Sequence, residues 1–440
     1  RTTTFRVTEA ELDRSIDACR AQSDQFRLSR LSFARAGLRA QAGSVEAIGD
    51  YDAAIAALSR VDATGIADLR TWREGMRQSL DEAIRFAIKS GRDADALRWI
   101  VLIRSHGSIS HPPNDQTVAL VYWALSDCIC SWVIRPSGVF FHAEPFSRPS
   151  LARMAQAARE DQGAAADLYD TLLRPLEGDL RGATDLVIFA DELFSGVPFA
   201  ALYDRRRHNY VVEHFDVRSA RTLSLAKTPV PSNSWTPLIV ADPAFDATVL
   251  PDLPRLPGAI AEAKAIKESF PRARILTGTG ATVDIVEQAA PQYGVLHVAA
   301  HAIGGDAAMT PSAVVLASDS ARSGLLYASE IRAKIFGCFH LVVISACRSA
   351  ADGKGDISDI AEALLAAGVP SVIGSVSDVA DAQSAEFYGD FYRVLALTKD
   401  PAAAFRRAQL DDIRRHSSTW KNYMMFTAGW PANEREETSR

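Results

Sequence analysis

Two short apolar runs, each ending in a reactive side chain, constrain the fold of this chain most. The first is Gly294–His301, with the sequence GVLHVAAH, and the second is Leu341–Cys347, with the sequence LVVISAC. Runs that are continuous in apolar residues are typical of strands buried on both faces of a parallel sheet. In an open α/β sheet, chemistry collects just past the carboxyl ends of the strands. We therefore expect His301 and Cys347 to meet there as base and nucleophile, which favours a cysteine peptidase.

The sequence divides into three regions by its patterns. Residues 1–110 carry apolar side chains at helical spacing and are predicted to be helical. Residues 111–232 begin at a Pro-rich break and combine strands with helices. Residues 233–440 follow a second break, Lys227–Ser234, and alternate strands with helices. This alternation predicts an α/β fold with a mostly parallel sheet and right-handed crossovers.

Composition argues against several classes of protein. A net charge of −6 and a pI near 5.9 argue against nucleic-acid binding driven by bulk charge. No apolar stretch approaches the length of a membrane span, so we expect direct contact with neither nucleic acid nor a membrane. Arg1–Thr4 has no initiating Met and no apolar signal segment, so a trimmed or processed chain is expected. The five cysteines lack metal or disulfide spacing, which favours a reducing cytoplasm, no metal and no cofactor.

A metal site formed by His297 and His301 is one alternative interpretation of the first run. Positions four apart on a strand lie roughly 13 Å from each other, too far to share one zinc ion. The residue after the first His is Val298, where a helical zinc motif has Glu. We therefore expect His297 to be a buried, hydrogen-bonded core residue. His301 is expected to be open to a cleft, because a loop-forming run, Ala302–Asp306, follows it.

Taken alone, Cys347 would most simply be a small buried residue. A His at a strand end about 50 residues earlier is the arrangement that caspase-type peptidases use. In this hypothesis His301 assists formation of the thiolate and later protonates the leaving amine, while Cys347 attacks the scissile carbonyl. The backbone N–H groups of Cys347 and of the loop that begins at Ala302 are predicted to form the oxyanion hole. The sequence identifies no third group that orients the imidazole.

Acidic residues in the loops near the predicted cleft are the tentative substrate-binding residues. They are Asp356, Asp378 and Asp381. An acidic S1 pocket made from them would favour a basic P1 residue. Loop acids are also commonly just solvated, so both interpretations stay open.

With these residues placed, the chain resembles the CHAT family of caspase-like peptidases, relatives of separase that are often attached to TPR helices. His297–His301 resembles the family's H-x-A-x-H strand, and Ile344–Ser349 is similar to its S-A-C-x-T signature, so the resemblance gives catalytic roles to His301 and Cys347. Further similar elements are Val197–Leu202, Leu256–Ala263, Ala366–Val369 and Trp420–Gly429. The resemblance implies a caspase-like three-layer α/β sandwich over residues 233–440. It also implies a preceding inactive caspase-like half over residues 111–232 and a TPR-like region over residues 1–110.

Two residues depart from the family pattern: Ala302 stands where Gly is usual, and Ser377 where Trp is usual. The resemblance implies a bacterial, cytoplasmic cysteine endopeptidase that cleaves a protein partner and acts in defence or cell-death signalling. We expect it to be latent until an activating protein docks on the N-terminal helices. One alternative is a catalytically inactive caspase-fold scaffold for protein–protein interaction. A third is a nucleotide-binding regulator built on the turn at Gly278 and Gly280.

Overall fold

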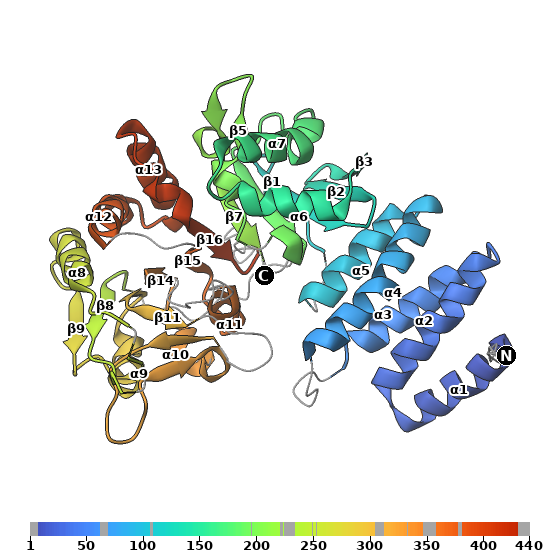
Figure 1. Ribbon diagram of the computed structural model, residues 1–440, viewed down its shortest axis with the longest axis horizontal. Coiled ribbons are helices and arrows are strands. Elements are labelled where there is room, and N and C mark those ends of the chain that lie inside the picture. The colour runs from blue at the N-terminus through green and yellow to red at the C-terminus, as the bar shows by residue number, and fades with distance from the viewer. Residues whose placement is uncertain are drawn as a thin grey trace, which may run out of the picture. The chain divides into compact units, whose positions relative to one another are not determined.

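The computed structural model divides into two compact units, Arg1–Ile109 and Ser110–Arg440, and each is described by itself (Figure 1). The residues that the structure describes are 8–61, 69–105, 109–194, 196–220, 223, 234–248, 250–251, 253–303, 312–331, 333–345, 358–376 and 381–429. None of the described helices combines the length and the apolar character that a membrane span requires.

The first unit is helical, as the apolar spacing predicts. Its helices are α1 (Glu9–Gln22), α2 (Gln25–Gln41), α3 (Ala47–Leu58), α4 (Leu69–Lys89) and α5 (Asp93–Ser105). Thr8 begins α1 with a capping box, in which Thr8 and Glu11 each accept a hydrogen bond from the other's backbone N–H. Arg35 on α2 donates to Asp13 on α1 at 2.6 Å and to Asp50 on α3 at 2.7 Å. These ion pairs connect three consecutive helices.

The described strands of the second unit form an eleven-stranded sheet in the order β3-β2-β1-β4-β7-β16-β15-β14-β10-β8-β9. Their bounds are β1 Thr117–Ala124, β2 Cys128–Arg135, β3 Gly138–Pro145, β4 Asp185–Ala190, β7 Asp216–Ala220, β8 Pro237–Pro243, β9 Arg274–Gly278, β10 Val295–Ala299, β14 Leu341–Ser345, β15 Ser371–Ser375 and β16 Tyr423–Thr427. In the part of this order that runs from β4 to β9, each strand is parallel to its neighbour, except that β15 and β16 are antiparallel. Because β7 pairs with β16, the predicted regions 111–232 and 233–440 share one sheet.

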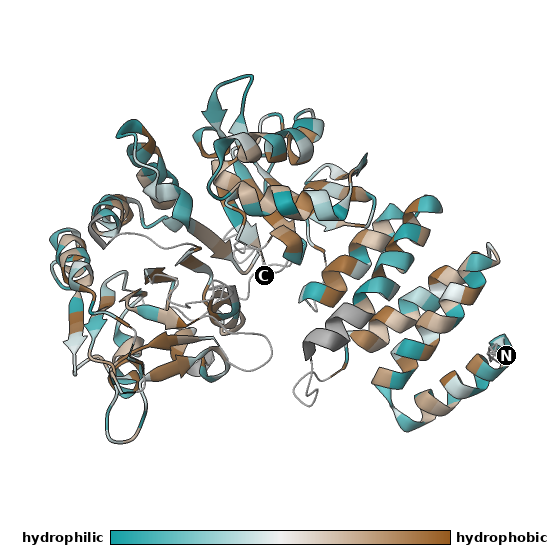
Figure 2. Ribbon diagram, in the orientation of Figure 1, coloured by the Kyte–Doolittle hydropathy of each residue, from teal (hydrophilic) through white to brown (hydrophobic). Residues whose placement is uncertain are grey.

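Helices cover both faces of the sheet between β16 and β9, which gives three layers. Helices α8 (Pro257–Ser269), α12 (Asp381–Thr398) and α13 (Pro401–Arg414) pack on one face, and α9 (Val283–Ala289), α10 (Ala333–Phe336) and α11 (Ser358–Ala366) on the other. Figure 2 shows hydrophobic residues along the central strands of this part of the sheet and hydrophilic ones on α8, α12 and α13. The predicted fold class is therefore confirmed. The two apolar runs have no polar alternation because side chains on both faces are buried.

In the other part of the sheet, helices α6 (Arg148–Ala157) and α7 (Gln162–Leu172) pack against β1, β2 and β4. A short hairpin, β5 (Tyr203–Asp204) and β6 (Asn209–Tyr210), lies between β4 and β7 in the sequence.

The first apolar run is not one strand. Strand β10 ends at Ala299, and His301 begins β11 (His301–Ile303), which belongs to a separate antiparallel sheet with β12 (Ala313–Val315) and β13 (Leu325–Tyr327). The prediction that the residues after His301 begin a loop is therefore wrong for Ala302 and Ile303. Both are apolar or small residues that pair with β12, and a continuous apolar run does not reveal a change of sheet.

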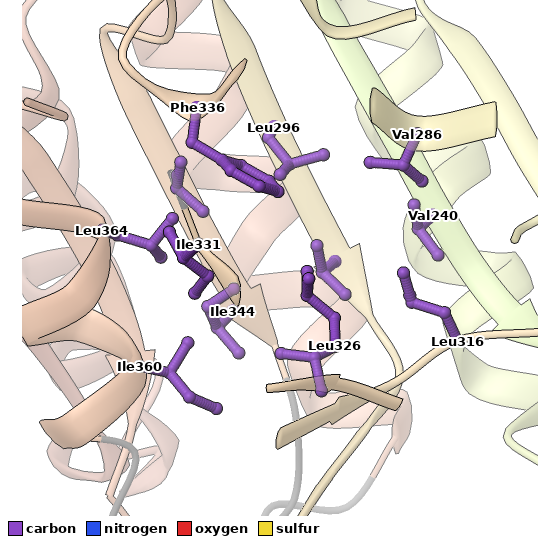
Figure 3. A pocket seen from close by; sticks show the side chains of 13 residues that line it. Val240, Val286, Leu296, Leu316, Leu326, Ile331, Phe336, Ile344, Ile360 and Leu364 are labelled. Atoms are coloured by element: carbon purple, nitrogen blue, oxygen red, sulfur yellow. The ribbon is translucent and has the colours of Figure 1, made fainter. Parts of the chain in front are cut away.

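A small apolar cavity lies between the main sheet, the sheet β11–β13 and the helices α9, α10 and α11 (Figure 3). Val342 and Ile344 of β14 and Leu364 of α11 are among its lining residues. Every lining side chain is apolar, so the cavity offers no group that would orient a polar ligand. It is a gap in core packing close to the carboxyl ends of β10 and β14.

Candidate active site

His301 lies two residues after the carboxyl end of β10, beside the end of β14. Parallel pairing of β10 with β14 sets Ala299 opposite Ser345. Cys347 follows Ser345 by two residues in the sequence, as His301 follows Ala299. Cys347 lies outside the described residues. The structure therefore describes the predicted base and the strand that leads to the predicted nucleophile.

The imidazole of His301 is enclosed by a segment that follows β8. The residue is 4% exposed. Its Nε2 lies 2.7 Å from the carbonyl oxygen of Pro254, and the ring of Phe245 meets it edge to face, with 5.6 Å between the ring centroids. The prediction that His301 is open to a cleft is therefore wrong. The physical reason is a contact between residues 47 positions apart, which no local pattern in the sequence indicates.

The contact with Pro254 fixes the tautomer of a neutral His301. A carbonyl oxygen can only accept a hydrogen bond, so Nε2 carries the proton and donates it. Nδ1 is then the nitrogen with the lone pair, and it has no hydrogen-bond partner among the described residues. His301 is thus held so that Nδ1 can accept a proton. Sequence reasoning missed the Pro254 carbonyl, because a backbone acceptor has no residue-type signal.

His297 is fully buried, as predicted, in a cluster of polar side chains below the site. Its Nδ1 lies 3.1 Å from the hydroxyl of Tyr392, and its Nε2 lies 2.7 Å from Oε1 of Glu262, without the alignment of a hydrogen bond. The other carboxylate oxygen of Glu262 accepts from the hydroxyl of Ser345 at 3.1 Å. Burial, and then the nearby Glu262, raises the pKa of Tyr392 well above its ordinary value, so its hydroxyl stays neutral.

Glu262 is the residue of this cluster that sequence reasoning missed as a functional position. It lies on α8, is 2% exposed, and contacts side chains of both β10 and β14. The one signal was its place in Leu256–Ala263, an element that resembles the family pattern. A single Glu in an amphipathic helix is otherwise expected on the solvent face.

The remaining predicted site residues divide into described and undescribed positions. Ala302 lies in β11 opposite Val314. Asp356 and Asp378 lie outside the described residues, and Asp381 begins α12 with its side chain outside them. None of the predicted substrate-binding carboxylates can thus be placed against His301.

Two other chemistries can be compared with the described part of the chain. Within it, no group of three His, Cys, Asp or Glu side chains could hold a metal ion. The turn with Gly278 and Gly280 leads to Thr282, whose hydroxyl accepts from the backbone N–H of Ile285 and caps α9. This turn therefore has a structural function at the start of a helix.

The fold is an α/β structure in which helices cover both faces of a mostly parallel sheet, with a buried His at the carboxyl edge of that sheet. The chain belongs to the CHAT domain family, whose profile matches residues 162–428, more than half of the sequence. The matched residues include both apolar runs. A comparison with curated protein sequences gave no match.

Solved structures of low sequence identity resemble the chain. The Arg-specific cysteine proteinase gingipain R is 10% identical, with a TM-score of 0.36, over 64% of this chain and 67% of its own. The pro- and mature domains of the gingipain RgpB from Porphyromonas gingivalis match with 9% identity and a TM-score of 0.35, over 64% of this chain and 69% of theirs. Separase from Saccharomyces cerevisiae, in complex with securin, matches with 8% identity and a TM-score of 0.44, over 96% of this chain and 37% of its own. The chain thus spans little more than a third of separase, and these likenesses carry no inference about activity.

Proposed function

We propose that this chain is a cysteine endopeptidase in which His301 and Cys347 form a catalytic dyad. The observation that carries the proposal is the one-sided hydrogen bonding of a buried imidazole. His301 has a polar partner at Nε2 and none at Nδ1 among the described residues, whereas the core residue His297 has a polar group beside each nitrogen. A buried polar atom without a partner is costly in a purely structural residue. A nucleophile reached from the end of β14 would satisfy Nδ1.

The proposed reaction uses the two nitrogens of His301 differently. Nδ1 accepts the thiol proton of Cys347, and the resulting thiolate attacks the carbonyl carbon of the substrate. The protonated imidazole then donates its Nδ1 proton to the leaving amine as the peptide C–N bond breaks, and water hydrolyses the thioester that remains. Nε2 keeps its proton throughout and donates it in a hydrogen bond to the Pro254 carbonyl oxygen. The backbone N–H groups of Ala302 and Cys347 are the proposed oxyanion donors.

Membership of the CHAT family supports further parts of the proposal. The substrate is a protein, with Asp356, Asp378 and Asp381 as candidates for an acidic S1 pocket that selects a basic P1 residue. The peptidase is cytoplasmic and latent until an activating protein docks on the N-terminal helices. Its proposed setting is bacterial defence or cell-death signalling.

Alkylation of the individual cysteines, followed by mass spectrometry, tests the dyad. Cys338 is the internal control, because burial raises the pKa of its partly buried thiol above the ordinary value. We expect Cys347 to react faster than Cys338 at neutral pH, and His301→Gln to slow only Cys347. Equal rates for the two thiols would contradict the dyad and favour the catalytically inactive scaffold.

Mapping of new protein termini tests endopeptidase activity directly. Cells or lysates with the wild-type chain are compared with those containing Cys347→Ala, and the cleavages that disappear identify substrates and their P1 residues. Loss of a nucleophile lowers turnover by roughly 10⁴-fold or more, so cleavage by the variant should be undetectable. Cleavages that persist in the variant would remove Cys347 from the mechanism.

A further inference from the structure

The carboxyl end of β8 has an unusual backbone conformation at Asp242. Its φ is +47°, in the left-handed region, and the pairing of β8 with β9 shifts register between Ala241 and Pro243. Asp and Asn adopt this region more readily than other residues with a side chain. Strand β8 is the parallel neighbour of β10, so this irregular end of the strand lies beside the strand that precedes His301.

The carboxylate of Asp242 holds the chain segment that precedes α8. Its Oδ1 accepts from the backbone N–H of Leu256 at 3.0 Å and from Nε of Arg255 at 2.9 Å. Its Oδ2 accepts from a terminal nitrogen of Arg255 at 2.5 Å. One side chain therefore makes three hydrogen bonds to two consecutive residues, which restrains both the backbone and the side chain of this segment.

The residue just before this segment is Pro254, whose carbonyl oxygen accepts from Nε2 of His301 at 2.7 Å. A continuous series of contacts thus runs from Asp242 through Arg255 and Leu256 to Pro254 and His301. We propose that Asp242 is a positioning residue for His301, which fixes the Pro254 carbonyl and through it the orientation and tautomer of the imidazole. The inference rests on the proposed function for its effect on peptide hydrolysis.

Burial shows which partner of the ion pair is the fixed one. The side chain of Asp242 is 11% exposed, whereas that of Arg255 is 60% exposed. The bonds from Arg255 lower the pKa of Asp242 below its ordinary value, and the bond from the Leu256 N–H acts in the same direction. Asp242 is thus an ionised acceptor near neutral pH. An exposed Arg contributes little by its charge alone, so the bond to the Leu256 N–H is the more important restraint on the backbone.

Two substitutions that both tolerate a positive φ test the role of the carboxylate. Asp242→Gly removes all three hydrogen bonds without adding backbone strain, and Asp242→Asn keeps an acceptor for the Leu256 N–H. Arg255→Ala is the matched control, because it removes the exposed partner and leaves the backbone bond. Thermal melts establish that each variant is folded, and Asp242→Ser, too short to reach both partners, replaces Asp242→Gly should the latter not fold.

The tautomer of His301 gives a readout that a merely structural role would not move. In ¹⁵N NMR of the full chain at neutral pH, assigned with His301→Gln, the wild type should carry the imidazole proton on Nε2. We expect Asp242→Gly to populate both tautomers and to lower kcat at least about tenfold with little change in KM, since small misplacements of a catalytic group have effects of this size. Asp242→Asn and Arg255→Ala should stay close to the wild type.

Several results would overturn the inference. One is that Asp242→Gly leaves both the tautomer of His301 and kcat unchanged. The others are that the wild-type imidazole of His301 carries its proton on Nδ1, or that Arg255→Ala has as large an effect as Asp242→Gly. Failure of the proposed function is distinguishable from these results. If the wild type hydrolyses no peptide but Asp242→Gly still changes the tautomer of His301, the positioning role stands and the peptidase proposal falls.

Discussion

Removal of the Glu262 carboxylate should loosen the two strands that lead to the predicted dyad. Glu262 is 2% exposed and lies against Nε2 of His297 on β10 and the hydroxyl of Ser345 on β14. In Glu262→Ala, the fully buried Nε2 of His297 loses the carboxylate beside it, and the partly buried hydroxyl of Ser345 loses a hydrogen-bond acceptor. The hydroxyl of Tyr392 remains the hydrogen-bond partner of Nδ1, the other ring nitrogen of His297.

The size of the effect follows from burial and from the size of the unit. A buried polar group that loses its partner costs about 1–3 kcal/mol, because it stays desolvated. The unit Ser110–Arg440 has about 330 residues and an unfolding entropy of about 0.7 kcal/mol/K, at about 2.1 cal/mol/K per residue. We therefore expect Glu262→Ala to lower the melting temperature of this unit by about 1–4 °C.

Calorimetry of the full chain at neutral pH measures this shift, with two controls on the same helix. Glu262→Gln keeps the shape and an acceptor for Ser345, so its loss should be clearly smaller. Glu268→Ala removes an exposed carboxylate of α8 and should change stability by less than about 0.5 kcal/mol. A melting temperature for Glu262→Ala within about 1 °C of that for Glu268→Ala would refute the claim that this cluster stabilises the ends of the strands.

Two further predictions concern other parts of the same sheet. Burial raises the pKa of Asp216 above its ordinary value of 3.8, so ionisation lowers stability as pH rises through the raised pKa. Asp216→Asn should raise the melting temperature at neutral pH and give no gain at about pH 3, and equal gains at both would contradict this. Val342 lines the apolar cavity, whereas Val343 faces the opposite side of β14. Val342→Ile should stabilise the fold by up to about 1 kcal/mol, because the cavity can accept a methyl group, whereas Val343→Ile should destabilise it by about 1–3 kcal/mol. Denaturant melts that show Val342→Ile as the less stable variant would contradict this.

The strands of the parallel sheet were predictable because their physical requirement is simple. Strands covered by helices on both faces need apolar residues at every position, and Val295–Ala299 and Leu341–Ser345 meet that requirement except at His297 and Ser345. Both exceptions lie against Glu262, which accepts a hydrogen bond from Ser345 and has Oε1 2.7 Å from Nε2 of His297. The polar residue inside a buried strand was therefore informative, although the sequence did not identify its partner.

The surroundings of His301 were not predictable, for two physical reasons. Strand β10 ends one residue before Ala300, and the chain continues into another sheet with no change in apolar character. The acceptor for Nε2 is a backbone carbonyl, a group that every residue carries. Local periodicity can locate a histidine at a strand end, but it cannot indicate which distant segment covers the imidazole.

Helix α8 explains how both strand ends can be positioned without any local signal. Its entry is fixed by Asp242 and places the Pro254 carbonyl on His301, and its middle carries Glu262, which holds Ser345 across 83 residues of sequence. A rigid helix that is bonded at both points transmits less positional error than two independent loops would. It follows that Asp242→Gly and Glu262→Ala act on one element rather than on two separate contacts. Their effects on melting temperature should then fall short of additivity when combined, because either change alone already frees α8 from part of the sheet.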